Sequence, residues 1–160
     1  RNFEPIFKLS QKLFDKIIYV LKNFITFSHD DPSSLVTTLR IIEREEKIDE
    51  YWKKMYTSNE SQTSYMPPGR PKKWASYIDN TICDTIHEDI KKIKSNINFD
   101  DKLALTEYLE KICNYVIKNI LSIQTYSVRC FPPSYQILAR VSTNYHKVIK
   151  EIIEKIINEL

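Results

Sequence analysis

Glycine is almost absent from this sequence. One glycine, Gly69, occurs in 160 residues. Sheet proteins need glycine for hairpin turns and bulges, so its scarcity, together with many Ile, Leu, Lys and Glu, favours a few long helices. Phosphate-binding loops need several glycines so that backbone amides can approach the phosphates, which excludes the nucleotide-binding and kinase fingerprints. We therefore expect an all-α fold and no cofactor.

Cysteine is also scarce. Cys83, Cys113 and Cys130 are odd in number and far apart, without a CxxC pair. This pattern indicates reduced thiols in a cytosolic protein rather than a disulfide framework. No apolar run approaches the roughly 20 residues needed to cross a bilayer.

Catalytic and metal-binding patterns are missing as well. His87-Glu88 begins an HExxH zinc-protease motif, but Lys91 stands where the second histidine ligand belongs. The acidic pairs at 30–31 and 100–101 are better explained as helix starts than as acid/base groups. We expect neither an enzyme nor a metal site. A helical hydrolase would require convergence of carboxylates such as those of Glu43, Glu46, Glu107 and Glu110.

The charge of the chain is nearly balanced. There are 24 basic and 21 acidic side chains, giving a net charge of +3. The two halves of the sequence are similarly balanced, so neither is a polyelectrolyte. Non-specific nucleic-acid binding needs a concentrated basic face, which this distribution does not supply.

Apolar residues recur at helical spacing along most of the chain. They predict about five long amphipathic helices, at 3–28, 32–56, 74–95, from about 100 to the turn at 131–133, and from 133 to the end. Connections are short except for a polar, proline-rich loop at 57–71, so an elongated antiparallel bundle or rod is expected. Residues 1–160 are interpreted as one helical-rod segment from a longer chain.

Several helix ends can be predicted from capping residues. Asp31 is a suitable N-cap and Pro32 a suitable first helical residue. Asp100 is expected to cap the fourth helix, with Phe99 packing back onto its first turn. Pro71 is expected at the first position of the third helix. The first helix is expected to bury the stripe formed by Ile6, Leu13, Ile17, Leu21 and Phe24.

The most specific stretch runs from Arg40 to Asp49 and resumes from Met66 to Trp74. In the first part, the i,i+4 spacing of Glu43 and Lys47 fits a solvated helix face. The same charges also fit a polar interface, with Arg44 or Glu46 paired to a neighbouring helix or subunit. Both interpretations stay open on the sequence alone.

The second part of that stretch cannot be helical. Pro67, Pro68, Gly69 and Pro71 lie within five residues, and each proline lacks an amide donor and restricts the residue before it. One interpretation is a rigid corner with Arg70 and Lys72 exposed. The alternative is a nucleic-acid-binding module, because Gly69-Arg70-Pro71 matches the core of an AT-hook, which enters the minor groove of DNA.

These segments carry a resemblance to a known family. The chain resembles the exocyst complex component 3 family, the Sec-six subunit of the exocyst, in the residues at 31–32, 35–36, 40–49, 67–72 and 74. The similarity continues in the same order at 130–133, 135 and 145–146. It is weaker over the first helix and over the polar segment 57–64.

The resemblance implies a non-catalytic helical rod that tethers secretory vesicles to the plasma membrane before SNARE-mediated fusion. It also implies other exocyst subunits as partners, together with SNARE proteins or their regulators. The location would be cytoplasmic and peripheral at the plasma membrane and secretory vesicles, with indirect membrane contact. Binding surfaces would then replace a catalytic site, and the candidate interaction residues are Arg44, Glu46, Met66, Pro67, Pro68, Gly69, Arg70, Lys72 and Trp74.

Overall fold

The computed structural model describes residues 3–57, 65–93 and 101–159. It contains the helices α1 (Glu4–Lys22), α2 (Phe24–Asp30), α3 (Pro32–Thr57), α4 (Tyr77–Ile93), α5 (Lys102–Ser122) and α6 (Ile137–Glu159). Short 3₁₀ turns occupy Trp74–Ser76 and Pro133–Tyr135, and a π-helical turn, Ile123–Ser127, extends α5. No strand occurs in these ranges, which confirms the all-α class.

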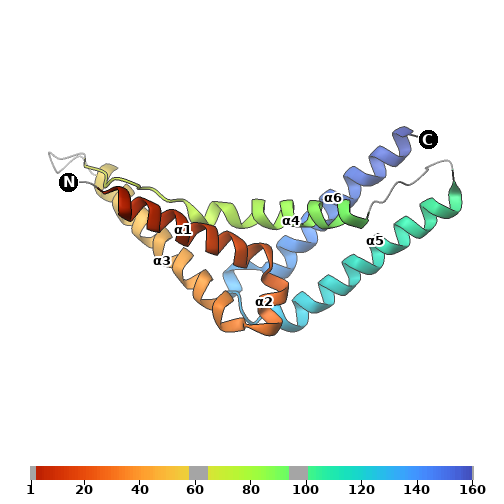
Figure 1. Ribbon diagram of the computed structural model, residues 1–160, viewed down its shortest axis with the longest axis horizontal. Coiled ribbons are helices and arrows are strands. Elements are labelled where there is room, and N and C mark those ends of the chain that lie inside the picture. Colours follow the sequence, from red (N-terminus) through yellow and green to blue (C-terminus); the bar gives the residue numbers. More distant parts are fainter. Residues whose placement is uncertain (1–2, 58–64, 94–100, 160) are drawn as a thin grey trace.

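The helices form a V with two arms, as Figure 1 shows. One arm contains α1, α3 and the start of α4, and the other contains the rest of α4 with α5 and α6. The arms meet where α2 packs against α3 and the π-helical turn. The molecule is thus elongated, but its helix axes splay instead of forming one straight stack.

The expected first helix is in fact two helices. Asn23 interrupts it, because its side-chain amide donates a hydrogen bond of 2.8 Å to the carbonyl of Tyr19 and competes with the helical pattern. After this break Phe24 meets the ring of Phe131 edge to face, with centroids 5.7 Å apart. The prediction of five helices was therefore one short, and the extra helix brings the two arms together.

Two other helix starts can be compared with the predictions. The Asp31 carboxylate accepts hydrogen bonds from Ser33 and Ser34, and α3 begins at Pro32 as expected. The N-cap of α5 is Asp101 rather than Asp100, since its carboxylate accepts from the amides of Leu103 and Ala104. The expected packing of Phe99 lies outside the described residues.

Two prolines expected at helix starts are not in α-helices. Pro71 belongs to the extended connection, and α4 begins only after the 3₁₀ turn at Trp74–Ser76. Pro133 likewise starts a 3₁₀ turn, and α6 begins four residues later, after Gln136 adopts a left-handed conformation. In both places the turn reorients the chain before the helix starts.

One continuous core runs through both arms. Its most completely buried side chains include Leu21, Leu35, Ile42, Ile78, Ile82, Ile123, Val141 and Val148. The predicted stripe of the first helix is only partly correct, because Ile17, Leu21 and Phe24 are buried whereas Ile6 and Leu13 are exposed. None of the described helices combines the length and apolarity required to cross a membrane.

Candidate functional site

The Pro67–Trp74 segment, here called the corner, returns the chain from the end of α3 toward α4 (Figure 1). The amide of Arg70 donates to the carbonyl of Pro67 at 3.2 Å and closes a turn. Gly69 has a φ of 80° at the third position, as a type II turn requires. A Cβ atom on Gly69 would lie 2.9 Å from the ring of Phe7 and would displace that side chain.

Asp49 fixes the corner to α3. One oxygen of its carboxylate accepts a hydrogen bond of 2.8 Å from the Arg70 guanidinium. The other oxygen accepts from the backbone amides of Lys72 and Lys73, at 2.8 and 2.9 Å. A single side chain therefore satisfies a charge and two backbone donors in a segment that has no regular secondary structure.

Glu45 lies one helical turn before Asp49 and completes the ion cluster. Its Oε2 atom is 2.7 Å from the Arg70 guanidinium and 3.0 Å from the Lys72 ammonium group. The geometry leaves Oε2 without a well-angled hydrogen bond, so attraction between charges holds these groups together. Burial acts to lower the pKa of Arg70, but Asp49 and Glu45 outweigh it and the pKa is raised.

Trp74 anchors the end of the corner in the core. Its side chain is buried and its ring lies 5.7 Å from that of Phe14 on α1. The Lys72 ammonium group stands 4.3 Å from the Trp74 ring centroid, a cation–π distance. Lys72 thus bridges the ion cluster and the core.

These contacts correct one expectation about the corner. Arg70 and Lys72 were expected to be exposed, yet their side chains are only 14% and 21% exposed and face α3. Because Arg70 is paired with two carboxylates of its own chain, it is not available to enter a DNA groove. The corner is rigid, but its cations stabilise the fold.

Beside the corner, α3 borders a groove made of two adjoining hollows. The first is lined by Glu46, Glu50, Lys53, Met66 and Pro71, among others. The second is lined by Glu46 and Glu50 again, with Ala75, Tyr135 and Arg140 across from α3. We call this surface the α3 groove. It has exposed carboxylates on one side and apolar groups opposite them.

The α3 groove carries charges of both signs. Burial is the main reason that the pKa of Tyr135 is raised, and the charges of Glu46 and Glu43 raise it further. Arg140 acts in the opposite direction, but its guanidinium is paired with Asp79 at 2.8 Å. Lys47, Lys53 and Lys73 also line the groove, so its exposed carboxylates would meet cations of a partner and its lysines would meet anions.

The candidate residues from the sequence separate into two groups. Arg44, Glu46, Pro68 and Gly69 are exposed, and Met66 and Pro67 are half-buried. Arg70, Lys72 and Trp74 face the chain's own interior. The structure brings Glu46 and Met66 together along the α3 groove, whereas Arg44 does not line it.

Sequence reasoning missed Glu45, Asp49 and Glu50. Glu45 and Asp49 lie four residues apart and so share one helix face, which could have marked them as partners for the cations of the corner. Glu50 follows Glu46 by the same interval. Lys47 does pair with Glu43, at 2.9 Å, so this part of the helix surface is solvated as the spacing indicated.

The described residues offer little for catalysis. Glu43, Glu46, Glu107 and Glu110 are all exposed, and they do not converge on one enclosed cavity. No group of three His, Cys, Asp or Glu side chains is placed to hold a metal ion in the ranges that the structure covers.

Comparisons with known proteins agree with the resemblance at the sequence level. The family model for exocyst complex component Sec6 matches residues 3–160. The chain is 30% identical over 157 residues to exocyst complex component 3 of Drosophila melanogaster, and 31% identical over 128 residues to that of Caenorhabditis elegans. An exocyst complex component 3-like protein of Danio rerio is 20% identical over 135 residues.

The matches cover most of this chain but only a small part of each relative. They cover 98%, 80% and 84% of this chain, but only 21%, 16% and 17% of the three relatives. The chain therefore spans about a fifth of their length. No solved structure matches it. Since the family model extends over nearly every residue, the chain belongs to the exocyst complex component Sec6 family.

Proposed function

We propose that this chain is a non-catalytic scaffold segment of an exocyst subunit that tethers secretory vesicles to the plasma membrane before SNARE-mediated fusion. Family membership supports the proposal most directly, because the two relatives at 30% and 31% identity are named as exocyst components. The location that follows is cytoplasmic and peripheral at the two membranes.

The groove beside α3 is the proposed contact surface for a sister exocyst subunit. Glu46 and Glu50 are exposed at its edge, and Met66 and Pro71 supply apolar area. An interface of this kind combines apolar contact with charge complementarity, which steers the encounter and fixes register. We therefore expect a partner surface with charges of both signs around an apolar centre, with basic side chains opposite Glu46 and Glu50.

The ion cluster at the corner keeps the α3 groove in shape. Asp49 lines the first hollow while it holds the amides of Lys72 and Lys73. Pro71 and Lys73, on the same hollow, are positioned by these bonds. Residues of the corner thus act on binding by preorganising the groove, and Glu46, Glu50 and Met66 act by contact.

Cross-linking within the assembled complex tests this function. The protein that contains this chain would be purified from its own cells with its partners, treated with a lysine-reactive cross-linker and analysed by mass spectrometry. We expect sister exocyst subunits among the partners and cross-links from Lys47 or Lys53, which flank the groove. Absence of exocyst subunits from the purified material would contradict the function. A SNARE protein linked to these lysines would instead identify a SNARE as the partner.

A further inference from the structure

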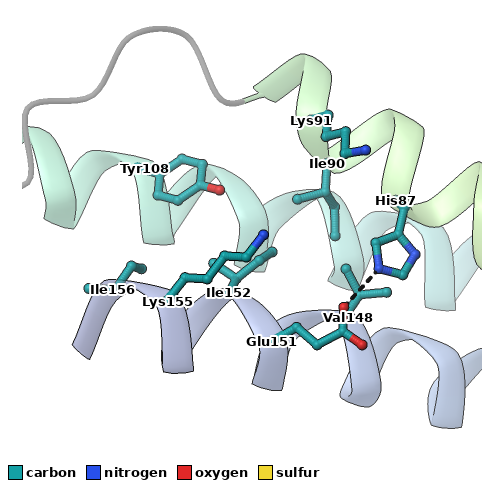
Figure 2. Close-up of a pocket in the computed structure, with 9 residues that line it drawn as sticks. All are labelled: His87, Ile90, Lys91, Tyr108, Val148, Glu151, Ile152, Lys155 and Ile156. Atoms are coloured by element: carbon teal, nitrogen blue, oxygen red, sulfur yellow. Dashed lines mark hydrogen bonds and ion pairs between the residues drawn. The ribbon is translucent and has the colours of Figure 1, made fainter. Parts of the chain in front are cut away.

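The arm opposite the corner contains a pocket between α4, α5 and α6 that the proposed function does not use. Figure 2 shows its lining residues, which are His87, Ile90, Lys91, Tyr108, Val148, Glu151, Ile152, Lys155 and Ile156. Its volume is about 160 Å³. Cavities near this size hold a benzene molecule, so the pocket suits one ring-sized or branched group rather than a long acyl chain.

The floor of the pocket is apolar. Ile90, Val148 and Ile156 are buried, and Ile152 is half-buried beside them. A bulky apolar side chain placed there would remove this surface from water, which contributes about 25 cal/mol for each Å² buried. The floor therefore provides affinity without selecting among apolar groups.

Tyr108 presents an unpaired hydrogen-bond donor to this pocket. Its side chain is 4% exposed, and its hydroxyl has no hydrogen-bond partner among the described residues. Figure 2 shows the hydroxyl oxygen turned into the pocket. Burial raises the pKa of Tyr108, so the group stays a neutral O–H donor. Solvent reaches this oxygen through the pocket, so a ligand that enters can replace water as the acceptor of its hydrogen bond.

Positive charge surrounds the same space. Lys91 and Lys155 line the pocket, and neither forms an ion pair within the part of the chain that the structure describes. Figure 2 shows the Lys155 ammonium group and the Tyr108 hydroxyl directed to one region of the pocket. An acidic group at that point would meet a cation and a neutral donor together.

The one carboxylate that lines the pocket, that of Glu151, already has a partner within the chain. Glu151 is 3.0 Å from Nε2 of His87, and the pKa of Glu151 is lowered mainly by this hydrogen bond. Nδ1 of His87 lies 3.0 Å from the carbonyl of Cys83, so both ring nitrogens of His87 have partners within the chain. Glu151 is thus engaged by His87, and Lys155, whose charge also lowers the pKa of Glu151, has no ion pair of its own among the described residues.

We propose that this pocket binds a short acidic segment of a protein partner, with one bulky apolar side chain on the isoleucine floor and a neighbouring carboxylate against Lys155 and Tyr108. The volume argues for a single anchoring side chain, and the unpaired cations argue for acidic residues beside it. The site lies in the opposite arm from the α3 groove and its unpaired charges are cations alone, so it would take a different partner segment.

Binding of a defined peptide tests the proposal. The probe is acetyl-Glu-Glu-Phe-Glu-Glu-amide, titrated into the protein and followed by isothermal calorimetry and by the NMR signals of the isoleucine methyl groups. We expect saturable binding with shifts at Ile90, Ile152 and Ile156. The same peptide with alanine in place of phenylalanine should bind at least tenfold more weakly, because the floor would be empty. Equal binding of the two peptides would overturn the proposal.

Two variants locate the peptide. Lys155→Glu reverses the charge at an exposed position and should weaken binding at least tenfold. Tyr108→Phe keeps the ring and should weaken it about two- to tenfold, the range of one hydrogen bond. Lys118→Glu, an equal charge change on α5 away from the pocket, is the matched control and should retain affinity. Circular dichroism would verify that each variant keeps its helical content.

Three results would reject the proposal. No saturation at millimolar peptide means that the pocket does not take an acidic apolar segment. Binding that neither Lys155→Glu nor Tyr108→Phe weakens places the peptide elsewhere on the molecule. Binding of 3-phenylpropionate, which carries the ring and one carboxylate, without binding of the peptide would assign the pocket to a small carboxylate instead of a protein.

Discussion

The two polar clusters of this chain differ in whether their charges are paired. At the corner, Arg70 and Lys72 meet carboxylates from α3, and the remaining oxygen of Asp49 receives two backbone amides. In the opposite arm, the hydroxyl of Tyr108 and the ammonium group of Lys155 face a pocket without such partners. Pairing therefore separates groups that maintain the fold from groups that are available to a ligand, although both clusters are partly buried.

The largest expected effect is at Asp49. Asp49→Ala would leave the half-buried Arg70 with one fewer partner and two backbone amides without an acceptor. We expect the free energy of unfolding to fall by about 2–4 kcal/mol, less than for a fully buried pair because water reaches the cluster. Urea unfolding followed by circular dichroism measures it. Glu46→Ala, three residues earlier on the exposed face, should change stability by no more than about 0.5 kcal/mol. Equal losses of unfolding free energy in the two variants would show that the paired carboxylate of Asp49 stabilises the fold no more than the exposed one of Glu46.

A smaller loss is expected at the tip of the corner. Gly69→Ala introduces a side chain at a φ of 80°, and its Cβ would approach the ring of Phe7 to 2.9 Å. The left-handed conformation costs roughly 1–2 kcal/mol for an ordinary residue, and the Phe7 ring can move aside. Thermal unfolding should show a lower midpoint. Ser76→Ala, at an exposed position in the next turn, provides a comparison. An unchanged midpoint for Gly69→Ala would contradict this prediction, because it would mean that the turn accommodates a Cβ atom without strain.

In the pocket, removal of a polar group should not destabilise the protein. Tyr108→Phe deletes a hydroxyl that solvent reaches and that has no partner among the described residues, so the free energy of unfolding should change by no more than about 0.5 kcal/mol. Urea unfolding of the variant without peptide gives this value. Tyr145→Phe is the matched control, because the Tyr145 hydroxyl accepts a hydrogen bond from Asn119 at 2.9 Å. Clear destabilisation by Tyr108→Phe would show that its hydroxyl is structural.

The smallest effect concerns pH. The pKa of Glu151 is lowered in the folded protein, first by its hydrogen bond with His87. A carboxylate whose folded pKa is depressed adds stability above its unfolded pKa, and this is lost as pH falls through the folded pKa. Between pH 5 and pH 3 the urea midpoint of the wild type should therefore decline more than that of Glu151→Gln. Glu107→Gln, at an exposed position on α5, should follow the wild type. Parallel curves for Glu151→Gln and the wild type would exclude this contribution.

Helical periodicity predicted much of the fold. The scarcity of glycine and the spacing of apolar residues indicated the all-α class, and the buried positions Leu35, Leu39, Ile42, Val141 and Val148 recur at helical spacings of three, four or seven residues. Breaks were harder to predict. Asn23 is compatible with a helix interior, and only its side-chain bond to Tyr19 and the tertiary contact of Phe24 make it an interruption.

The role of the corner was harder to predict than its position. The prolines identified a non-helical segment, but exposure of Arg70 and Lys72 was inferred from their polarity alone. Pairing depends on which face of α3 meets the returning chain, and this is set by contacts such as Phe14 with Trp74, which are 60 residues apart in the sequence. The pocket was not predicted at all. Its lining comes from α4, α5 and α6, and the way these helices pack cannot be read from the spacing of residues within any one of them.

The central claim is that exposed carboxylates of the α3 groove bind a sister subunit while the paired charges of the corner only hold the groove in place. The most direct measurement compares the wild type with the double variant Glu46→Lys and Glu50→Lys in the full protein, by quantifying the exocyst subunits that co-purify with each. We predict an at least fivefold loss of one or more subunits with an unchanged unfolding midpoint. Full recovery of every subunit by the folded double variant would contradict the claim.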